Sequence, residues 1–406
     1  MVSTETKVQK NIVFIGASSA AMGASLEWCE NHHEDYRFIM IEAKTHYNHV
    51  FAFPRASVIS GFEEQLFCPY DNMFLGDDTV GKVINARATE ITKDYVKLDR
   101  DVPGFGDKVE YAYLVYTAGT QIPAPGRFND LTSKEECIAR LQKYQEVIRE
   151  AQNPIIIGAG AVGLEIASEI KEHYPDKNVT LLHSRNRYLP RYKVSMDVMI
   201  YNILKKRGVK QKLGDRVILP KEGFPLEVKP VEIQTKGGKT IKGDLAIMCI
   251  GMSPNNSLIK AIAPESINPE TGFVKIKPTM QIQDDNYPNI FSAGDVCDHT
   301  DVKTGHYAWM QGLAVLNNIR KLIAGASQDE LEPYKSKDLA LIKVILGEKE
   351  AVTQTHQLGP LITYGSWVGG RSVPHNVYAS FSWGLLHVED RLEALLKKQS
   401  TDKTHN

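Results

Sequence analysis

The sequence has no closely spaced cysteines. Its five cysteines are spread along the chain, and none belongs to a CxxC or CxxxxC pattern. Redox-active dithiols and cysteine zinc sites are commonly built from such pairs. The spacing therefore argues against a dithiol relay, predicts no metal site, and is typical of reduced thiols in an intracellular protein.

The chain also lacks long apolar runs and an excess of charge of either sign. No apolar stretch approaches the roughly 18 residues that span a bilayer, and Val2 is not the glycine that N-myristoylation requires. The formal net charge is -1, so bulk electrostatics favour no nucleic-acid partner. We expect a cytoplasmic protein without a lipid anchor; peripheral contact with a membrane, such as a mitochondrial or lipid-droplet surface, is left open.

What remains is the composition of a soluble globular protein. Hydrophobic residues make up 42% and charged residues 24% of the chain, which is ordinary for that class. The 406 residues exceed what one hydrophobic core usually organises, so the length indicates two or three domains.

The most informative stretch is residues 153–170. An apolar run ending at Ile157 enters a Gly158-x-Gly160-x-x-Gly163 turn, and residues typical of a helix follow. Gly158 permits the tight turn, Gly160 lets the backbone approach a pyrophosphate, and Gly163 lets helix and strand pack closely. The pattern predicts the strand, turn and helix of a dinucleotide-binding βαβ unit.

A similar unit opens the chain. An apolar strand over residues 11–15 leads into a turn at Gly16, where Ser18 and Ala21 stand in place of the second and third glycines. Both substitutes are small, so a pyrophosphate can still come close. The next strand delivers Glu42, whose carboxylate is placed to accept hydrogen bonds from ribose hydroxyls. The alternative is an acid that ends a strand without contacting a ligand. The motifs in the rest of the chain favour the ribose contact.

The second unit ends its second strand differently. His183-Ser184-Arg185 stands where Glu42 stood in the first unit. Without an acid, the 2′-hydroxyl of the adenosine ribose loses its acceptor, whereas Arg185 or Arg187 could meet a 2′-phosphate. We therefore expect NADPH to be accepted, with NADH as a second coenzyme. The alternative, that both arginines are solvated loop charges, is about equally supported.

Further glycines and an acid mark the strand ends of both units. Strands of the first and second units end at Gly119 and Gly251, and the first unit resumes after the second. There a short strand ends in Gly294-Asp295, where small residues let the carboxylate accept hydrogen bonds from a polyol chain. A helix over residues 305–323 follows, and its N-terminus is available to a polar ring edge.

An irregular insertion rich in aromatic residues follows the second strand. It contains Arg55, preceded by Pro54. Such a segment is where the wall of a site would be built, and an arginine there could contact a cofactor phosphate. For a single arginine, a solvated surface position is an equally good interpretation, and both are kept at this point.

Two other helices are predicted outside the βαβ units. Residues 132–150 begin with a capping box formed by Thr132 and Glu135 or by Ser133 and Glu136. Within residues 331–406, strand-like runs precede one final helix whose apolar face carries leucines from position 385 to position 396. Its polar face has mixed charges, which favours packing on a sheet or in a dimer over a membrane surface.

These motifs together resemble the pyridine nucleotide-disulfide oxidoreductase superfamily, flavoproteins with two dinucleotide-binding domains. The segments that carry the resemblance are 16–21, Glu42, 117–119, 158–165, 251–255 and 291–295. The segments at 53–57, 183–184 and 295–298 further resemble the AIF-like, ferroptosis-suppressor-like subfamily of fungal type.

The resemblance implies an α/β fold. It has two Rossmann-like domains, the second inserted in the first, and a small α+β C-terminal domain. The FAD-binding domain would comprise residues 1–120 and 272–330, and the NAD(P)H-binding domain residues 121–271. Residues 331–406 would form a C-terminal interface domain.

The resemblance also implies the positions of the cofactors. FAD would place its pyrophosphate at residues 16–21, its adenosine ribose on Glu42 and its ribityl chain at Asp295. NAD(P)H would lie on residues 158–163 of the second turn. The remaining cofactor contacts are expected from Arg55, Gly119, Ser184, Arg185, Gly251 and Gly294.

The expected catalytic residues are Glu165 and His306. By resemblance, Glu165 faces the edge where nicotinamide and flavin meet, and His306 stands near the flavin. The implied activity is that of an FAD-dependent NAD(P)H oxidoreductase that passes a hydride to flavin and then electrons to a quinone-type acceptor. The alternatives are reduction of a ferredoxin-type carrier, a flavin-dependent monooxygenase, and a non-enzymatic AIF-like role in death signalling. A homodimer is left open.

Overall fold

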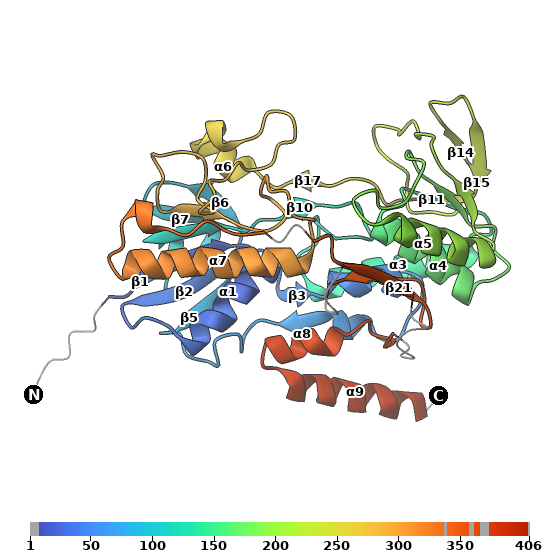
Figure 1. The fold of residues 1–406 in the computed structure, drawn as a ribbon. Coiled ribbons are helices and arrows are strands. Elements are labelled where there is room, and N and C mark those ends of the chain that lie inside the picture. The colour runs from blue at the N-terminus through green and yellow to red at the C-terminus, as the bar shows by residue number, and fades with distance from the viewer. Residues whose placement is uncertain (1–7, 337–338, 357–360, 366–372, 405–406) are drawn as a thin grey trace, which may run out of the picture.

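The computed structural model describes residues 8–336, 339–356, 361–365 and 373–404, so Val2 lies outside the described residues. Figure 1 shows two α/β lobes side by side, with the C-terminal elements below them. Each lobe is built on a parallel sheet. The α/β class and the parallel sheets predicted from the sequence are therefore confirmed.

The first lobe contains a five-stranded parallel sheet in the order β18-β9-β1-β2-β5. Its strands are β1 (Lys10–Ile15), β2 (Tyr36–Glu42), β5 (Gly81–Asn85), β9 (Tyr113–Tyr116) and β18 (Ile290–Ser292). Alternation along β1 builds two cores, because Ile12 and Phe14 face one side and Val13 and Ile15 the other.

Two helices cover one face of this sheet. They are α1 (Ser19–Glu30) and α7 (Gly305–Ile323), and α7 has the bounds that the sequence predicted. The helices approach closely because a Cβ at Gly312 would lie 2.0 Å from the Ala20 carbonyl oxygen. The other face is covered by an antiparallel sheet of β6 (Ala88–Ile91), β7 (Tyr95–Val102) and β8 (Gly106–Glu110).

The second lobe repeats this plan with a four-stranded parallel sheet in the order β13-β12-β11-β16. Its strands are β11 (Pro154–Ile157), β12 (Thr180–Leu182), β13 (Lys210–Lys212) and β16 (Leu245–Met248). Ile156 faces the helical side, whereas Ile155 and Ile157 face a hairpin of β14 (Val231–Gln234) and β15 (Thr240–Gly243).

Three helices belong to the second lobe: α3 (Lys134–Glu150), α4 (Ala161–His173) and α5 (Val194–Lys206). The second of the two predicted capping boxes is the one that forms. The Ser133 side chain accepts from the Glu136 N–H, and the Glu136 carboxylate accepts from the Ser133 N–H. Both bonds satisfy donors that the first turn of α3 would otherwise leave unpaired.

The chain crosses between the lobes twice, and the two crossings pair with each other. Strand β10 (Thr120–Gln121) leaves the first lobe and pairs antiparallel with β17 (Ser253–Pro254), which leaves the second. After the second sheet is complete, β18 returns to the first sheet beside β9. Short elements fill the connections: β3 (His46–Asn48), η1 (Val50–Ala52), α2 (Phe53–Ala56), η2 (Glu63–Leu66), β4 (Phe67–Pro69), α6 (Ser257–Ile262), η3 (Pro264–Ser266) and η4 (Gln328–Glu330).

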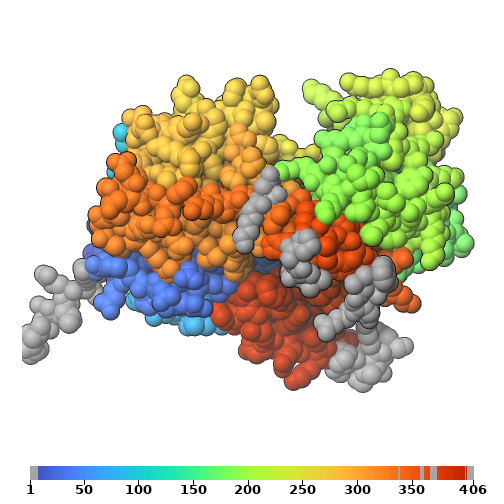
Figure 2. Space-filling model, viewed as in Figure 1, coloured from blue at the N-terminus to red at the C-terminus, as the bar shows by residue number. Residues whose placement is uncertain are grey.

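The C-terminal segment borders both lobes on the face shown in Figure 2. It contains an antiparallel sheet of β19 (Ile342–Ile345), β20 (Ala351–Thr355) and β21 (Ile362–Gly365), then α8 (Ala379–Leu385) and α9 (Glu389–Thr404). The single final helix predicted from the sequence is thus divided in two. The division lies where His387 adopts a left-handed conformation, φ 55°, which an α-helix cannot include.

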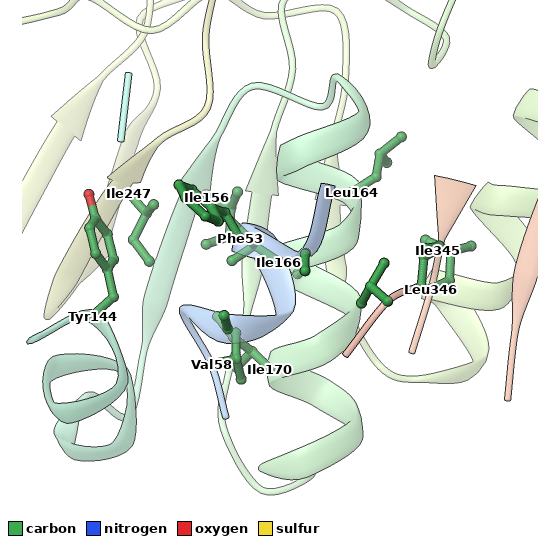
Figure 3. Packing of buried hydrophobic residues seen from close by; sticks show 14 of the residues in the cluster. Phe53, Val58, Tyr144, Ile156, Leu164, Ile166, Ile170, Ile247, Ile345 and Leu346 are labelled. Atoms are coloured by element: carbon green, nitrogen blue, oxygen red, sulfur yellow. The ribbon is translucent and has the colours of Figure 1, made fainter. Parts of the chain in front are cut away.

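Hydrophobic contacts join the C-terminal segment to both lobes. Figure 3 shows Phe53 of α2, Ile166 and Ile170 of α4, and Ile345 at the end of β19 in one cluster of buried side chains. Buried His49 adds polar contacts, since its ring nitrogens lie 2.8 Å from Ser382 Oγ and 2.9 Å from the Val377 carbonyl oxygen. Among the described helices, none combines the length and apolar character needed to cross a bilayer.

Candidate functional site

The two glycine-rich turns have the same geometry. Gly16 and Gly158 adopt φ of 102° and 104°, which favours glycine. A Cβ at Gly16 would lie 2.6 Å from the Thr117 carbonyl oxygen, and one at Gly158 would lie 2.4 Å from the Cys249 carbonyl oxygen. In each lobe the turn therefore touches the backbone at the end of a neighbouring strand, and no larger residue fits.

The other two glycines of the second turn have opposite surroundings. A Cβ at Gly163 would lie 1.9 Å from the Gly158 carbonyl oxygen, so this glycine holds helix α4 against the turn. A Cβ at Gly160 would meet no atom of the described residues within 4 Å. Gly160 is the N-cap of α4 and supplies no side-chain cap, so the first N–H groups of the helix are available to a phosphate.

The first turn is built with less glycine but leaves the same helix start available. Ser18 is the N-cap of α1 and makes no side-chain capping bond. Ala21 is fully buried within α1, where its methyl group is accommodated. Gly16 and Ser18 both line a cavity of about 570 Å³. A pyrophosphate could reach this helix N-terminus from the cavity.

Glu42 stands at the wall of the same cavity in a fixed orientation. Its Oε2 accepts from the Ala17 N–H at 2.9 Å, and its Oε1 accepts from the Lys44 N–H at 2.9 Å. A carboxylate has about four acceptor positions, so two remain for ribose hydroxyls. This fits the predicted adenosine contact, and the cavity volume is in the range of cofactor pockets.

An arginine that the sequence did not single out also lines the cavity. Arg127 lines the cavity, and its Nη2 lies 3.0 Å from Asp295 Oδ2. Its Nη1 donates to the Thr120 carbonyl oxygen at 3.0 Å. Arg127 and Asp295 are 168 residues apart, so no local motif could reveal the pair. The pair joins a cation of the cavity wall to Asp295, the residue expected to contact the ribityl chain.

Gly119 and Gly251 lie at the two strand ends, with φ of 65° and 57°. The Gly119 carbonyl oxygen accepts from the Asn255 N–H at 3.0 Å, which links the two crossings between the lobes. Gly119 lines the cavity, as predicted for a cofactor contact, and so does Asn255. A Cβ at Gly251 would meet no atom of the described residues within 4 Å.

Arg55 requires a correction. Its Nε lies 2.8 Å from Glu169 Oε1 of α4, both side chains are 1% exposed, and its Nη1 donates to the Pro374 carbonyl oxygen. The guanidinium is therefore a buried structural cation and does not line the cavity. The reason is that α2 packs on α4, so the only favourable surroundings for the charge are another buried charge and backbone carbonyls.

Glu165 lies one helical turn before Glu169 on α4. Glu165 is half-buried, and its Oε1 accepts from the Ile345 N–H of β19 at 3.0 Å. Burial, reinforced by the nearby charge of Glu169, raises the pKa of Glu165 to about 8. The group is therefore mostly protonated at neutral pH and can donate a proton.

His306 occupies the first turn of α7 and is exposed. Its ring lies 5.2 Å from that of Tyr307. Within the described part of the chain, no hydrogen bond or ion pair joins His306 to Glu165, which belongs to the other lobe. The structure thus places the two expected catalytic residues on different lobes and does not bring them into contact.

The end of β12 copies the first lobe with a different side chain. His183 Nδ1 accepts from the Ala159 N–H at 3.2 Å, just as Glu42 accepts from the Ala17 N–H. Burial, followed by the charge of Arg185, lowers the pKa of His183. The ring is therefore neutral, and Nδ1 is already used as an acceptor. It offers no carboxylate to a ribose hydroxyl.

The neighbouring side chains differ in availability. Ser184 and Arg185 are exposed, so both can reach a ligand at the end of β12. Arg187 donates from Nη2 to the Tyr192 carbonyl oxygen, which ties its guanidinium to the loop. Of the two arginines considered from the sequence, the exposed Arg185 is the better placed to meet a phosphate.

Comparison with known proteins shows to which family a chain with these two glycine-rich turns belongs. The model of the family "Pyridine nucleotide-disulphide oxidoreductase" matches residues 10–312, about three quarters of the chain. The chain belongs to this family. It is 32% identical over 375 residues to "Fe-regulated protein 8" of Mycosarcoma maydis, covering 87% of this chain and 90% of the relative.

Two further similarities agree with the family. "Ferroptosis suppressor protein 1" of Homo sapiens is 28% identical over 327 residues, covering 78% of this chain and 82% of the relative. An engineered water-forming NADPH oxidase solved with NADPH has a TM-score of 0.63 at 19% identity, covering 86% of this chain and 77% of that one. As a member of the family, the chain is an oxidoreductase whose cofactors are FAD and NAD(P)H.

The two inner glycines of the second turn generate a paired prediction. Gly160→Ala should leave the free energy of unfolding within about 0.5 kcal/mol of the native value, because the methyl group meets no atom of the described residues. It should raise the dissociation constant of NAD(P)H at least about tenfold by blocking the pyrophosphate. Equilibrium unfolding and coenzyme titration measure the two effects.

Gly163→Ala is the matched control and should destabilise the fold by about 1–3 kcal/mol, because its methyl group meets the Gly158 carbonyl. Equal stability losses in the two variants, or native coenzyme affinity in Gly160→Ala, would contradict this assignment.

Proposed function

We propose that this protein oxidises NAD(P)H and passes the electrons through FAD to a quinone-type acceptor. The observation that carries the proposal is the presence of two glycine-rich turns in one chain. The first turn donates an N–H to Glu42 at the end of the next strand, and the second donates to His183 at the equivalent place. The first turn, with the Glu42 carboxylate, suits the resident FAD. The second turn, with His183, suits the exchangeable coenzyme.

The state of the cysteines supports electron transfer without a thiol intermediate. The described structure contains no disulfide, and all five cysteines are free. Burial raises the pKa of Cys249 and Cys297 to about 12 each, and that of Cys29 and Cys137 to about 11. Thiols that stay protonated are poor nucleophiles. Electrons therefore leave through FAD itself.

When bound, the two cofactors supply the hydride transfer and the onward delivery of electrons. The chain supplies binding and a proton. Glu42 and the N-terminus of α1 would hold the adenosine and pyrophosphate of FAD, and Gly160 would leave room for the coenzyme. Glu165 accepts from Ile345 through Oε1, so Oε2 carries the proton that a reduced quinone requires.

The formal net charge of -1 indicates no strongly charged docking surface for a protein carrier, which favours a small quinone as acceptor. The boundaries between the FAD, NAD(P)H and C-terminal domains stay as predicted above. Their support is the return of β18 to the first sheet and the pairing of β10 with β17.

The acceptor is tested by anaerobic reduction. Purified yellow protein should lose its flavin absorbance on addition of NADPH or NADH and should regain it when a soluble quinone is added. Stopped-flow absorbance measures both phases. Bleaching without reoxidation by any quinone would overturn the acceptor and leave the cofactor assignment intact.

Glu165 predicts a pH dependence. Because its pKa of about 8 lies above the ordinary carboxyl value of 4.5, the folded protein favours the protonated form. This contribution to stability is complete below pH 4.5 and is lost as pH rises through 8. Quinone reduction should fall over the upper part of the same range, as the proton donor is lost.

Glu165→Gln should be slower at neutral pH and should lack this decline between about pH 7 and 9. The free energy of unfolding of Glu165→Gln should also increase relative to that of the native protein as pH rises, because only the native protein loses stability by deprotonation at this position. The anaerobic bleaching step serves as the internal control, because it needs no proton from Glu165. An unchanged pH profile of quinone reduction in Glu165→Gln would exclude Glu165 as the donor.

His183 predicts the coenzyme preference. His183→Glu restores the carboxylate that Glu42 provides in the first lobe, and it should raise the ratio of kcat/KM for NADH to that for NADPH at least about tenfold, the effect of one hydrogen bond to a charged group. His32→Glu, the same change at an exposed position of the first lobe, is the control and should leave the ratio unchanged.

A further inference from the structure

A buried polar network lies behind the turn that carries Asp295. Gln311 of α7 and Asp301 are each 2% exposed. The Gln311 Oε1 accepts from the Gly294 N–H at 2.8 Å, and its Nε2 donates to Asp301 Oδ2 at 2.9 Å. A chain of hydrogen bonds thus runs from the buried Asp301 carboxylate through the buried Gln311 amide to the backbone N–H of Gly294.

The orientation of the Gln311 amide follows from its two partners. The backbone N–H of Gly294 can only donate, and the Asp301 carboxylate can only accept. The amide oxygen must therefore face Gly294, and the amide nitrogen must face Asp301. Reversing the amide would place two donors together at Gly294, so Asp301 fixes the direction of the acceptor that Gly294 meets.

Asp301 is itself held by the segment that leads to the C-terminal strands. Tyr334 donates its hydroxyl to Oδ2 at 3.0 Å, and Ser336 donates to Oδ1. The backbone N–H of Asp301 donates to His299 Nδ1 at 3.1 Å. The carboxylate therefore has partners on both oxygens, and it connects α7 with residues 334–336.

The other end of the network reaches the cavity. Gly294 adopts φ 81°, and the next residue, Asp295, pairs with Arg127 at 3.0 Å. Arg127 lines the cavity that contains Gly16 and Glu42. The Gly294 peptide therefore leads directly into the residue that pairs with Arg127.

We propose that Gln311 and Asp301 are positioning residues for FAD, which act by fixing the Gly294–Asp295 turn and through it the Asp295–Arg127 pair. Neither side chain lines the cavity, so both act through the turn. The proposal rests on the FAD assignment and is independent of the electron acceptor.

An exchange of the two side-chain chemistries tests the proposal. Gln311→Glu keeps the acceptor for Gly294 but sets a second carboxylate against Asp301, and like charges this close are strongly unfavourable when buried. Asp301→Asn alone can keep an oxygen toward Gln311 and turn its amide toward Ser336. In the double variant, the amide introduced at position 301 donates to the carboxylate introduced at position 311, and that carboxylate still accepts from the Gly294 N–H. Each link between Gly294, position 311 and position 301 again joins a donor to an acceptor, although the bond between positions 301 and 311 runs in the opposite direction and Tyr334 accepts at position 301 instead of donating.

The readouts are the FAD dissociation constant, from fluorescence titration of the apoprotein, and the midpoint potential of the bound flavin. Gln311→Glu should weaken FAD binding at least about tenfold, and Asp301→Asn alone less than about threefold. The double variant should return to within about threefold of the native constant and should recover the native potential.

Gln311→Met removes the acceptor altogether, so addition of Asp301→Asn should not rescue it. Asn318→Asp alters another buried amide of α7, bonded to the backbone of Thr279 and Glu332, and should lower stability without changing FAD affinity. If Gln311→Glu proves insoluble, a soluble yellow double variant supports the proposal and an insoluble one overturns it. Native FAD affinity in Gln311→Glu, or no improvement on adding Asp301→Asn, also overturns it.

Discussion

The ion pair between Arg55 and Glu169 is the buried charge contact at which all three parts of the chain meet. Arg55 belongs to the first lobe, Glu169 to the second, and the Pro374 carbonyl that also accepts from Arg55 to the C-terminal segment. Because both side chains are buried, loss of one partner would leave an unpaired charge, which typically costs about 3–5 kcal/mol. Glu165 lies one turn away, so this contact also sets the electrostatic surroundings of the proposed proton donor.

The two lobes show how one local plan serves two ligands. Gly16 and Gly158 make the same backbone contact, and Ala17 and Ala159 donate to the side chain at the end of the next strand. The difference is the acceptor at that strand end. A carboxylate keeps lone pairs for ribose hydroxyls, whereas a neutral imidazole has used its acceptor on the turn. The exchange of Glu42 for His183 in an otherwise common frame therefore changes what each strand end offers to a ribose hydroxyl.

Local signals were sufficient where the cause of the structure was local. The capping residues defined the start of α3, and the bounds predicted for α7, Gly305 to Ile323, were confirmed. The final helix was different, because its break lies at His387. This residue adopts a left-handed conformation although it is neither glycine nor proline, so the sequence contains no usual signal for the break. Arg127 and Gln311 were not singled out as site residues for a related reason, since their partners Asp295, Asp301 and Gly294 lie in other segments.

The sequence by itself determined the two βαβ units, because turn glycines, strand runs and helix caps act within a few residues of one another. It also determined the strand-end residues Glu42 and His183, whose positions follow from chain order. Only the tertiary structure decided what Arg55 and Glu165 do. The charge of a side chain is known from the sequence, but its partner and its burial depend on which helices meet. The packing of α2, α4 and β19 made Arg55 a buried counter-ion and raised the pKa of Glu165.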